Sequence, residues 1–496
     1  MEEYRATIAL SAVALYMFMC IGVGIWALRR TRSTRDFFVA GRNLGVLVTG
    51  LAIFSSTLSG FGFVGGPGLV YSTGMSSIWM VIVSSIGYAI AFFLVAKRLR
   101  LIAELRDTVS LPDAVRARYR SDAASVLTSI AILLGVMGYL ATQMLAMATV
   151  LQSVLGDSGI AVSFPTAIVV SAAVLVFYCV TGGIIASVYT DVVQGAIMVV
   201  AGTLVFVAAL SAVDGGMSGI SATLLADDPE SIGPFGTVGV IGCLGWYLVF
   251  GLGLAGQPHI VTKMMMNRRV RDARHILPLS LAGYVFAALL WIGIGLAMRA
   301  LVLSGDHPAL ARPDLAAPEF LTAYTHPLLA GVVFAGLFAA IMSTADGFLN
   351  IGAAALVHDL PRALLGRPPR RELLAARIGT VVLAVIAAAF ALYSYYVNDR
   401  LVAILGAFGW ATFAAALVPV VAIGMSWKRA TAPAACAAIL ISLGINFGVQ
   451  IGNVALPYGL DGGALSILVS MVVFIGISLA SAPPVLDRDI ASVMEL

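Results

Sequence analysis

Hydroxyl-bearing residues and glycines interrupt a long apolar stretch near the start of the chain. The stretch covers about 44–71, and its centre, residues 55–60, has the sequence SSTLSG. A helix that breaks at membrane depth frees backbone carbonyls, which are tolerated only where they line a cavity or are buried in protein. Carbonyl and hydroxyl oxygens suit a small cation such as sodium. The pattern therefore favours a broken helix beside a cation site, and close packing of small residues between helices is the alternative.

Two carboxylates and two hydroxyls lie within other apolar stretches. Asp191 starts the sixth stretch, and Asp346 lies in the ninth, three residues after Ser343 on the same helix face. The adjacent Ser343 and Thr344 hydroxyls can both reach one cation, whereas bonding back to their own helix is the alternative. An ionisable residue at membrane depth is a candidate functional residue, and for Asp191 we weigh that role against capping of a helix N-terminus.

A second interruption lies at 250–259, where the sequence reads FGLGLAGQPH. Three glycines and a proline so close together weaken helical hydrogen bonding. Tyr139 and Gln143, one turn apart on the fourth apolar stretch, either face a cavity or satisfy buried neighbours. We expect the substrate site where the two broken helices meet.

Composition limits the class of protein. Of the 496 residues, 60% are hydrophobic and only 11% are charged, which indicates a polytopic membrane protein. All four cysteines fall in apolar stretches, so neither a disulfide framework nor a zinc site is suggested. The chain has no HExxH, GxSxG or phosphate-loop motif. We therefore do not expect an enzyme, and transport would have to draw on an ion gradient.

Windows of about 20 apolar residues predict an all-α protein with thirteen transmembrane helices. They lie near 7–28, 44–71, 77–96, 123–151, 162–180, 188–212, 236–262, 276–303, 327–356, 374–395, 400–425, 431–450 and 464–481. An odd number of spans places the two termini on opposite sides of the membrane.

The basic residues predict the orientation of these spans. With thirteen spans, all 29 Lys and Arg residues except Arg5, Arg299, Arg312 and Arg400 fall on one side, which is the pattern of cytoplasmic loops. Lys263 is counted here as the first basic residue of the loop after the seventh span. The prediction is an N-terminus outside and a C-terminus in the cytoplasm.

Each interruption opens a set of five predicted spans, which is typical of inverted repeats. Because each set has an odd number of spans, the two copies have opposite orientations. The predicted division is an extra N-terminal helix and loop (1–43), a first repeat (44–212), an extracellular loop (213–235), an inverted second repeat (236–425), and two C-terminal helices with a short tail (426–496).

Six short motifs make the sequence resemble the sodium:solute symporter family, and its proline symporter branch most of all. They are DFFVAGR at 36–42, TGG at 181–183, TDVVQ at 190–194, GQPHI at 256–260, DHPAL at 306–310 and AIMST at 340–344. The resemblance implies a leucine-transporter-type fold and a sodium site between the first broken helix and the ninth helix. Carried over by motif, the ligands would be the carbonyls of Ser55, Leu58 and Ala340 and the hydroxyls of Ser343 and Thr344.

The resemblance also bears on a second cation and on the solute. In some members a second sodium ion is held by the acid that matches Asp191, and Asp346 is a further candidate ligand here. Where proline symporters carry an aspartate in the first broken helix, this chain has Thr57. The expected substrate residues are Ser56, Thr57, Phe61, Tyr139, Gln143, Phe250 and Gln257.

The resemblance thus implies a multi-pass symporter of the cell membrane that couples sodium entry to uptake of proline or another small amino acid. A sodium- or proton-coupled monocarboxylate transporter is the alternative, and a solute sensor is a more distant one. The expected partners are sodium, a small-molecule solute and membrane lipid, with neither nucleic acid nor an obligate protein partner.

Overall fold

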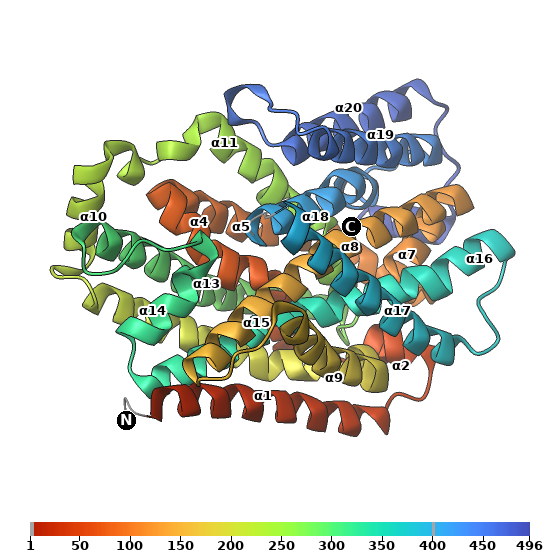
Figure 1. The fold of residues 1–496 in the computed structure, drawn as a ribbon. Coiled ribbons are helices and arrows are strands. Elements are labelled where there is room, and N and C mark those ends of the chain that lie inside the picture. The colour runs from red at the N-terminus through yellow and green to blue at the C-terminus, as the bar shows by residue number, and fades with distance from the viewer. Residues whose placement is uncertain (1–3, 399–401) are drawn as a thin grey trace.

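The computed structural model describes residues 4–398 and 402–496, and the elements of this part of the chain are helices joined by turns and short loops (Figure 1). Eleven helical stretches of the described residues are long and apolar enough to cross a membrane. The long helices are α1 (Arg5–Leu28), α5 (Ile78–Ala91), α8 (Asp122–Asp157), α9 (Phe164–Ser211), α13 (Ala273–Ser304), α15 (Pro327–Ala354), α17 (Glu372–Tyr393), α18 (Val402–Leu417), α19 (Ala432–Ile451) and α20 (Gly462–Ala480). The all-α class is confirmed.

Helix α9 covers two of the predicted windows. Its 48 residues would extend about 72 Å if straight, more than twice the hydrocarbon thickness of a bilayer. The helix turns at Gly183, which has φ of 53° and ψ of −144°. A side chain there would also meet the ring of Phe37 at 2.5 Å, so both conformation and space require glycine. The count of thirteen spans stays a prediction, since length and composition alone give eleven.

The first predicted break is confirmed. Helix α3 (Val46–Thr57) ends at Leu58, whose φ of −92° and ψ of 113° are extended. A π-helical turn η3 (Phe61–Gly65) and α4 (Gly66–Thr73) then continue the same stretch. Gly60 allows the close approach at this point, because a Cβ there would lie 2.6 Å from Ala146. The break thus places backbone groups against α8.

The second predicted break is also confirmed. Helix α11 (Gly239–Trp246) passes into a π-helical turn η8 (Tyr247–Gly251) and a 3-10 turn η9 (Leu252–Gly256). The backbone is extended at Gln257, and α12 (Pro258–Met264) follows. Lys263 lies within α12 and is only 1% exposed, so its assignment to a cytoplasmic loop is wrong.

Helix α15 lies at the centre of the fold, and most of its residues are buried. It packs against α9, α1 and α8, and α1 and the α19–α20 pair lie on opposite sides of the molecule (Figure 1). Small residues along α15 allow this packing: a Cβ on Gly331 would be only 3.2 Å from the side chain of Ile8 of α1. Close contact through small residues replaces the hydrophobic driving force that is missing between helices in lipid.

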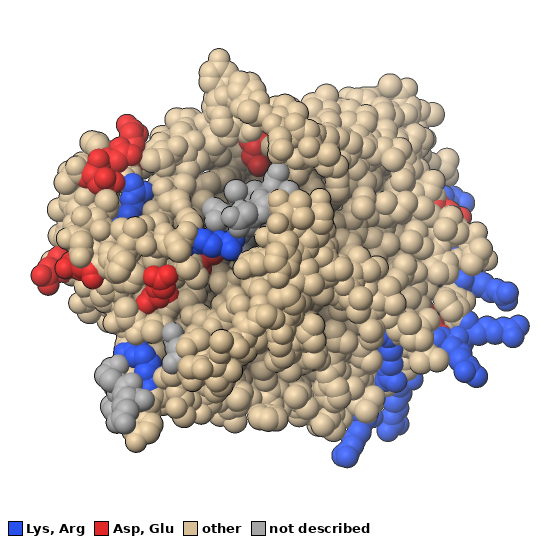
Figure 2. Space-filling model, in the orientation of Figure 1, with Lys and Arg blue, Asp and Glu red and all other residues tan. Residues whose placement is uncertain are grey.

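Charged residues gather at the two ends of the molecule (Figure 2). Most of the Lys and Arg side chains in view lie at the end where α2 (Thr34–Val39) and α16 (Leu360–Leu365) are found, with some acidic side chains among them. Most of the Asp and Glu side chains in view lie at the other end, near α10 (Gly216–Asp227) and α14 (Ala316–Tyr324). The remaining short helices are α6 (Lys97–Arg106), α7 (Leu111–Tyr119) and α21 (Arg488–Met494). Arg400, one of the predicted exceptions, lies outside the described residues.

Candidate functional site

The five oxygen atoms expected to bind sodium lie together where the break of α3 meets α15. The Ser343 hydroxyl is 2.9 Å from the carbonyl oxygen of Ser55 and 2.9 Å from that of Ala340. The Thr344 hydroxyl is 3.4 Å from the carbonyl oxygen of Leu58 and 3.3 Å from that of Ala340. The structure therefore brings together two hydroxyls and three carbonyls from segments about 280 residues apart.

This cluster has more acceptors than protons. Each hydroxyl carries one proton, yet the Thr344 oxygen has three carbonyl oxygens within 3.4 Å, including that of Ser56 at 3.1 Å. Ser343 and Thr344 are fully buried, so the cluster is shielded from bulk solvent. An excess of oxygen lone pairs in a buried site is the chemistry that a small hard cation satisfies.

Asp191 forms a buried ion pair with Lys263, which joins α9 to α12. The lysine Nζ donates to Oδ2 of Asp191 at 2.6 Å, and the side chains are 0% and 1% exposed. Oδ1 of Asp191 accepts a hydrogen bond from the Ser55 hydroxyl at 3.1 Å. Asp191 therefore contacts α3 next to its break, through Ser55. Its negative charge is balanced by the positive charge of Lys263.

Asp346 is also buried and has different partners. Its Oδ1 accepts from the Ser187 hydroxyl at 2.7 Å, and its Oδ2 accepts from the Tyr178 hydroxyl at 2.8 Å. Asp346 is 1% exposed, and no basic side chain of the described residues lies within ion-pair distance of it. The second-cation hypothesis for Asp191 and Asp346 stays a prediction.

Tyr139 and Gln143 support the break from α8. The Tyr139 hydroxyl and the Ser59 hydroxyl are 2.9 Å apart, and Oε1 of Gln143 accepts from the amide of Gly60 at 2.8 Å. Gln257 plays a similar part at the second break, where its Nε2 donates to the carbonyl of Trp410 at 3.0 Å. Of these contacts, the one between Gln143 and the Gly60 amide satisfies a backbone group that a continuous helix would have paired.

A small cavity lies between the two broken helices. Its volume is about 20 Å³, which holds about one water molecule. Three of the predicted substrate residues line it, namely Thr57, Phe61 and Phe250. The predicted residues Ser56, Tyr139, Gln143 and Gln257 are not part of its lining.

Four further polar or aromatic side chains of the lining were missed by sequence reasoning. They are Ser84, Tyr284, Trp291 and Trp410. Phe61 stacks on Phe250 with ring centroids 5.7 Å apart, and Trp291 meets Phe61 edge to face at 6.3 Å. Among the described groups, Nε1 of Trp291 is a buried donor without a hydrogen-bond partner. The cavity can therefore offer aromatic faces to a cation and an N–H group to an anion.

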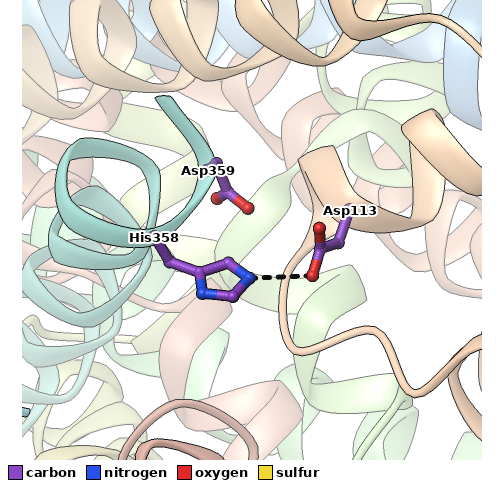
Figure 3. Close-up of side chains that lie close together, drawn as sticks. All are labelled: Asp113, His358 and Asp359. Atoms are coloured by element: carbon purple, nitrogen blue, oxygen red, sulfur yellow. Dashed lines mark hydrogen bonds and ion pairs between the residues drawn. The ribbon is translucent and has the colours of Figure 1, made fainter. Parts of the chain in front are cut away.

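Another cluster, of Asp113, His358 and Asp359, lies at the basic end of the molecule (Figure 3). These residue types could ligate a metal, but both ring nitrogens of His358 already contact carboxylates, Asp113 at 3.0 Å and Glu372. Arg362 lies 3.0 Å from the carboxylate oxygens of Asp113. Burial alone would raise the pKa of Asp113, but the hydrogen bond from His358 and the charge of Arg362 outweigh it and hold that pKa below its usual range. The cluster is an ion-pair brace between α7, η12 (Ala355–Asp359) and α17.

The fold is similar to those of solved transporters. A Na⁺-coupled sialic acid symporter in a substrate-bound outward-open state superposes with a TM-score of 0.80 at 18% identity, covering 96% of this chain and 98% of the other. Mhp1, a nucleobase-cation-symport-1 family transporter, gives 0.60 at 15% identity over 94% and 99% of the two chains. Together with the two broken helices, these likenesses define a multi-pass membrane protein with the leucine-transporter-type fold.

Sequence comparisons identify the family. The osmoregulated proline transporter OpuE of Bacillus subtilis is 29% identical over 442 residues, covering 87% of this chain and 86% of the relative. The sodium/proline symporter of Salmonella typhimurium is 30% identical over 452 residues, covering 88% and 86%. The model of the sodium:solute symporter family matches residues 37–442, and this chain belongs to that family. Sodium is accordingly its coupling ion.

Proposed function

We propose that this chain is a secondary active symporter that couples sodium entry to uptake of proline or another small amino acid. The relatives that cover most of this chain are named as proline transporters, one from Bacillus subtilis and one from Salmonella typhimurium. The observation that carries the proposal is the cavity between the two broken helices, which is small, aromatic and adjacent to the oxygen cluster of Ser343 and Thr344.

The lining of this cavity suits a small zwitterion. No carboxylate or basic side chain is part of the lining, so neither charge of an amino acid would be repelled. The stacked rings of Phe61 and Phe250 offer faces to an ammonium group and to the apolar ring of proline. Nε1 of Trp291 offers a hydrogen bond to the carboxylate. A solute larger than water enters only if these rings move apart.

A monocarboxylate is the second candidate solute. It would use the same N–H group of Trp291 and fill the aromatic cavity with its alkyl part. The hydroxyl of Thr57 already donates to the carbonyl of Ile53 at 2.9 Å and accepts from Tyr88 at 2.7 Å, so it offers little to an ammonium group. Thr57 therefore favours the second candidate, because a monocarboxylate has no ammonium group to bind.

Sodium is proposed to bind between the carbonyls of Ser55, Leu58 and Ala340 and the hydroxyls of Ser343 and Thr344. An ion there would tie the break of α3 to α15 and so order the residues that lead into the cavity, because Thr57 and Leu58 line it. Release of the ion would loosen the same contact. The break of α3 thus couples sodium binding to solute binding, because it contributes residues to both sites.

The proposed orientation places the N-terminus outside and the C-terminus in the cytoplasm of a cell membrane. The gathering of Lys and Arg side chains at the end of the molecule that carries α2 and α16 supports it (Figure 2). The two broken helices support the proposed division into inverted repeats at 44–212 and 236–425, since each would open one repeat.

The test is uptake of labelled proline into proteoliposomes under an imposed sodium gradient. Sodium-driven uptake that unlabelled proline blocks supports the proposal. Acetate, pyruvate, lactate and alanine as competitors separate the two candidate solutes. Absence of proline uptake, with sodium-driven uptake of labelled pyruvate or acetate, would assign the cavity to monocarboxylates.

A further inference from the structure

Lys263 is a buried ammonium group in a cage made only of oxygen atoms. Its Nζ contacts Oδ2 of Asp191 at 2.6 Å, the carbonyl oxygen of Ala52 at 3.3 Å and the hydroxyl of Ser56. A lysine ammonium has three protons, and each has one acceptor here. The cage comes from α3 and α9, and the ammonium is delivered from α12, so three helices meet at this single charge.

This cage has the composition of a cation site. A carboxylate, a backbone carbonyl and a hydroxyl are ligands that a sodium ion would accept, and their own net charge of one negative unit fits one monovalent cation. We propose that the ammonium group of Lys263 takes the place of a second transported cation in this cage, so that one sodium ion is bound and carried in each cycle. This inference rests on the proposed function only in taking sodium as the carried ion.

Residues 55 and 56 connect this cage to the proposed sodium site. The carbonyl oxygens of Ser55 and Ser56 lie within 3.1 Å of the Ser343 and Thr344 hydroxyls. The Ser55 hydroxyl donates to Asp191, and the Ser56 hydroxyl accepts from Lys263 while donating to the carbonyl of Ser343 at 3.2 Å. The end of α3 therefore contacts two cation positions. One is the proposed sodium site beside Ser343 and Thr344, and the other is occupied by the ammonium group of Lys263.

The ammonium group of Lys263 stays attached to the chain, whereas a sodium ion leaves its site during transport. Sodium released to the cytoplasm leaves its ligands empty, whereas Lys263 remains attached to α12 and neutralises Asp191 wherever the two helices stay in contact. The charge of Asp191 then requires no ion from solution. Asp346, with only hydroxyl partners, is the other place where a second sodium ion would bind, so the test must separate these two arrangements.

The test counts sodium ions bound to the purified full-length protein in detergent, by equilibrium binding of radioactive sodium. This readout needs no knowledge of the solute. We expect one ion per wild-type chain. Lys263→Met removes the charge, keeps most of the volume, and leaves the cage open, so we expect two ions per chain and a Hill coefficient for sodium that rises from about one toward two.

Three further variants control the result. Lys263→Arg keeps a positive charge in the cage, and we expect one ion. Lys263→Met combined with Asp191→Asn removes both charges, and the count should return to one. Lys428→Met makes the same substitution at a half-exposed lysine that pairs with Glu495, and it should leave one ion bound. Thermal unfolding of each variant shows which of them are folded.

The outcomes are distinct. Two ions on the wild type would overturn the inference and assign the second ion to Asp191 and Asp346. A folded Lys263→Met variant that still binds one ion would also overturn it. If that variant does not fold, the wild-type and Lys263→Arg counts decide between one ion and two. No sodium on the wild type would overturn the proposed sodium coupling itself.

Discussion

The hydroxyls of Ser343 and Thr344 provide the sharpest test of the proposed sodium site. Ser343→Ala removes one of five oxygens, namely the hydroxyl that lies 2.9 Å from the carbonyl oxygens of both Ser55 and Ala340. The interaction of a hydroxyl with a charged group contributes about 1.5–3 kcal/mol. Since about 1.4 kcal/mol corresponds to a tenfold change, the sodium concentration for half-maximal uptake should rise about ten- to a hundredfold.

The assay is uptake of labelled solute into proteoliposomes at a series of sodium concentrations, with choline keeping the ionic strength constant. Thr344→Ala should behave in the same way, and the double variant should show no saturation in the usable range. Ser129→Ala is a matched control, because this buried hydroxyl bonds only to the carbonyl of Ser125 in its own helix, at 2.9 Å. Its sodium dependence should equal that of the wild type.

Unchanged sodium dependence in a folded Ser343→Ala, Thr344→Ala double variant would refute this reasoning. The oxygen cluster would then be a helix-packing contact, in which the hydroxyls serve only to satisfy carbonyls at the break. A loss of thermal stability without a shift in sodium dependence would lead to the same conclusion.

Three other predictions concern the brace, the cavity and the break. Asp113→Asn leaves the charge of His358 without this partner and should destabilise the protein by about 3 kcal/mol, measured by thermal unfolding in detergent. Because its pKa is lowered in the folded state, Asp113 contributes stability above its ordinary value near pH 4, and this contribution should be lost as the pH falls further; a pH-independent effect of the variant would contradict this. Trp291→Phe keeps the ring and removes the N–H group, so the KM for a carboxylate-bearing solute should rise about tenfold, and an unchanged KM would exclude this contact. Gly60→Ala places a methyl group 2.6 Å from Ala146 and should cost about 1–3 kcal/mol of stability by the same unfolding measurement; no loss would mean that the helices can separate freely at the break.

The two helix breaks were predictable because their residue types differ from those of the apolar stretches around them. Hydroxyls and glycines at 55–60, and glycines with proline at 250–259, are a poor choice for continuous helices in an apolar chain, and the structure breaks both there. The residues of the oxygen cluster came from motifs of the family. Their meeting across a separation of about 280 residues follows from the fold.

Lys263 was missed because counting basic residues treats every lysine near a helix end as part of a loop. Lys263 lies five residues before Arg268, where the basic loop begins, and nothing in the sequence indicates that its side chain points inward. Its partner Asp191 is 72 residues away on another helix, so only the fold, in which α9 and α12 both pack against α3, reveals the pair. Trp291 and Trp410 were missed for a similar reason, because aromatic residues are common in membrane helices and only their tertiary positions assign them to the cavity.

The number of carried ions determines how steep a solute gradient the protein can sustain. One sodium ion crossing about 100 mV releases about 2.3 kcal/mol, and a tenfold sodium gradient adds about 1.4 kcal/mol. A cycle with one ion therefore supports accumulation of a neutral solute on the order of several hundredfold, and a cycle with two ions supports on the order of 10⁵-fold. A plateau near the lower value under these gradients agrees with Lys263 as a fixed internal cation. Accumulation well above a thousandfold would require a second ion, which would either bind at Asp346 or displace Lys263 from Asp191 during the cycle.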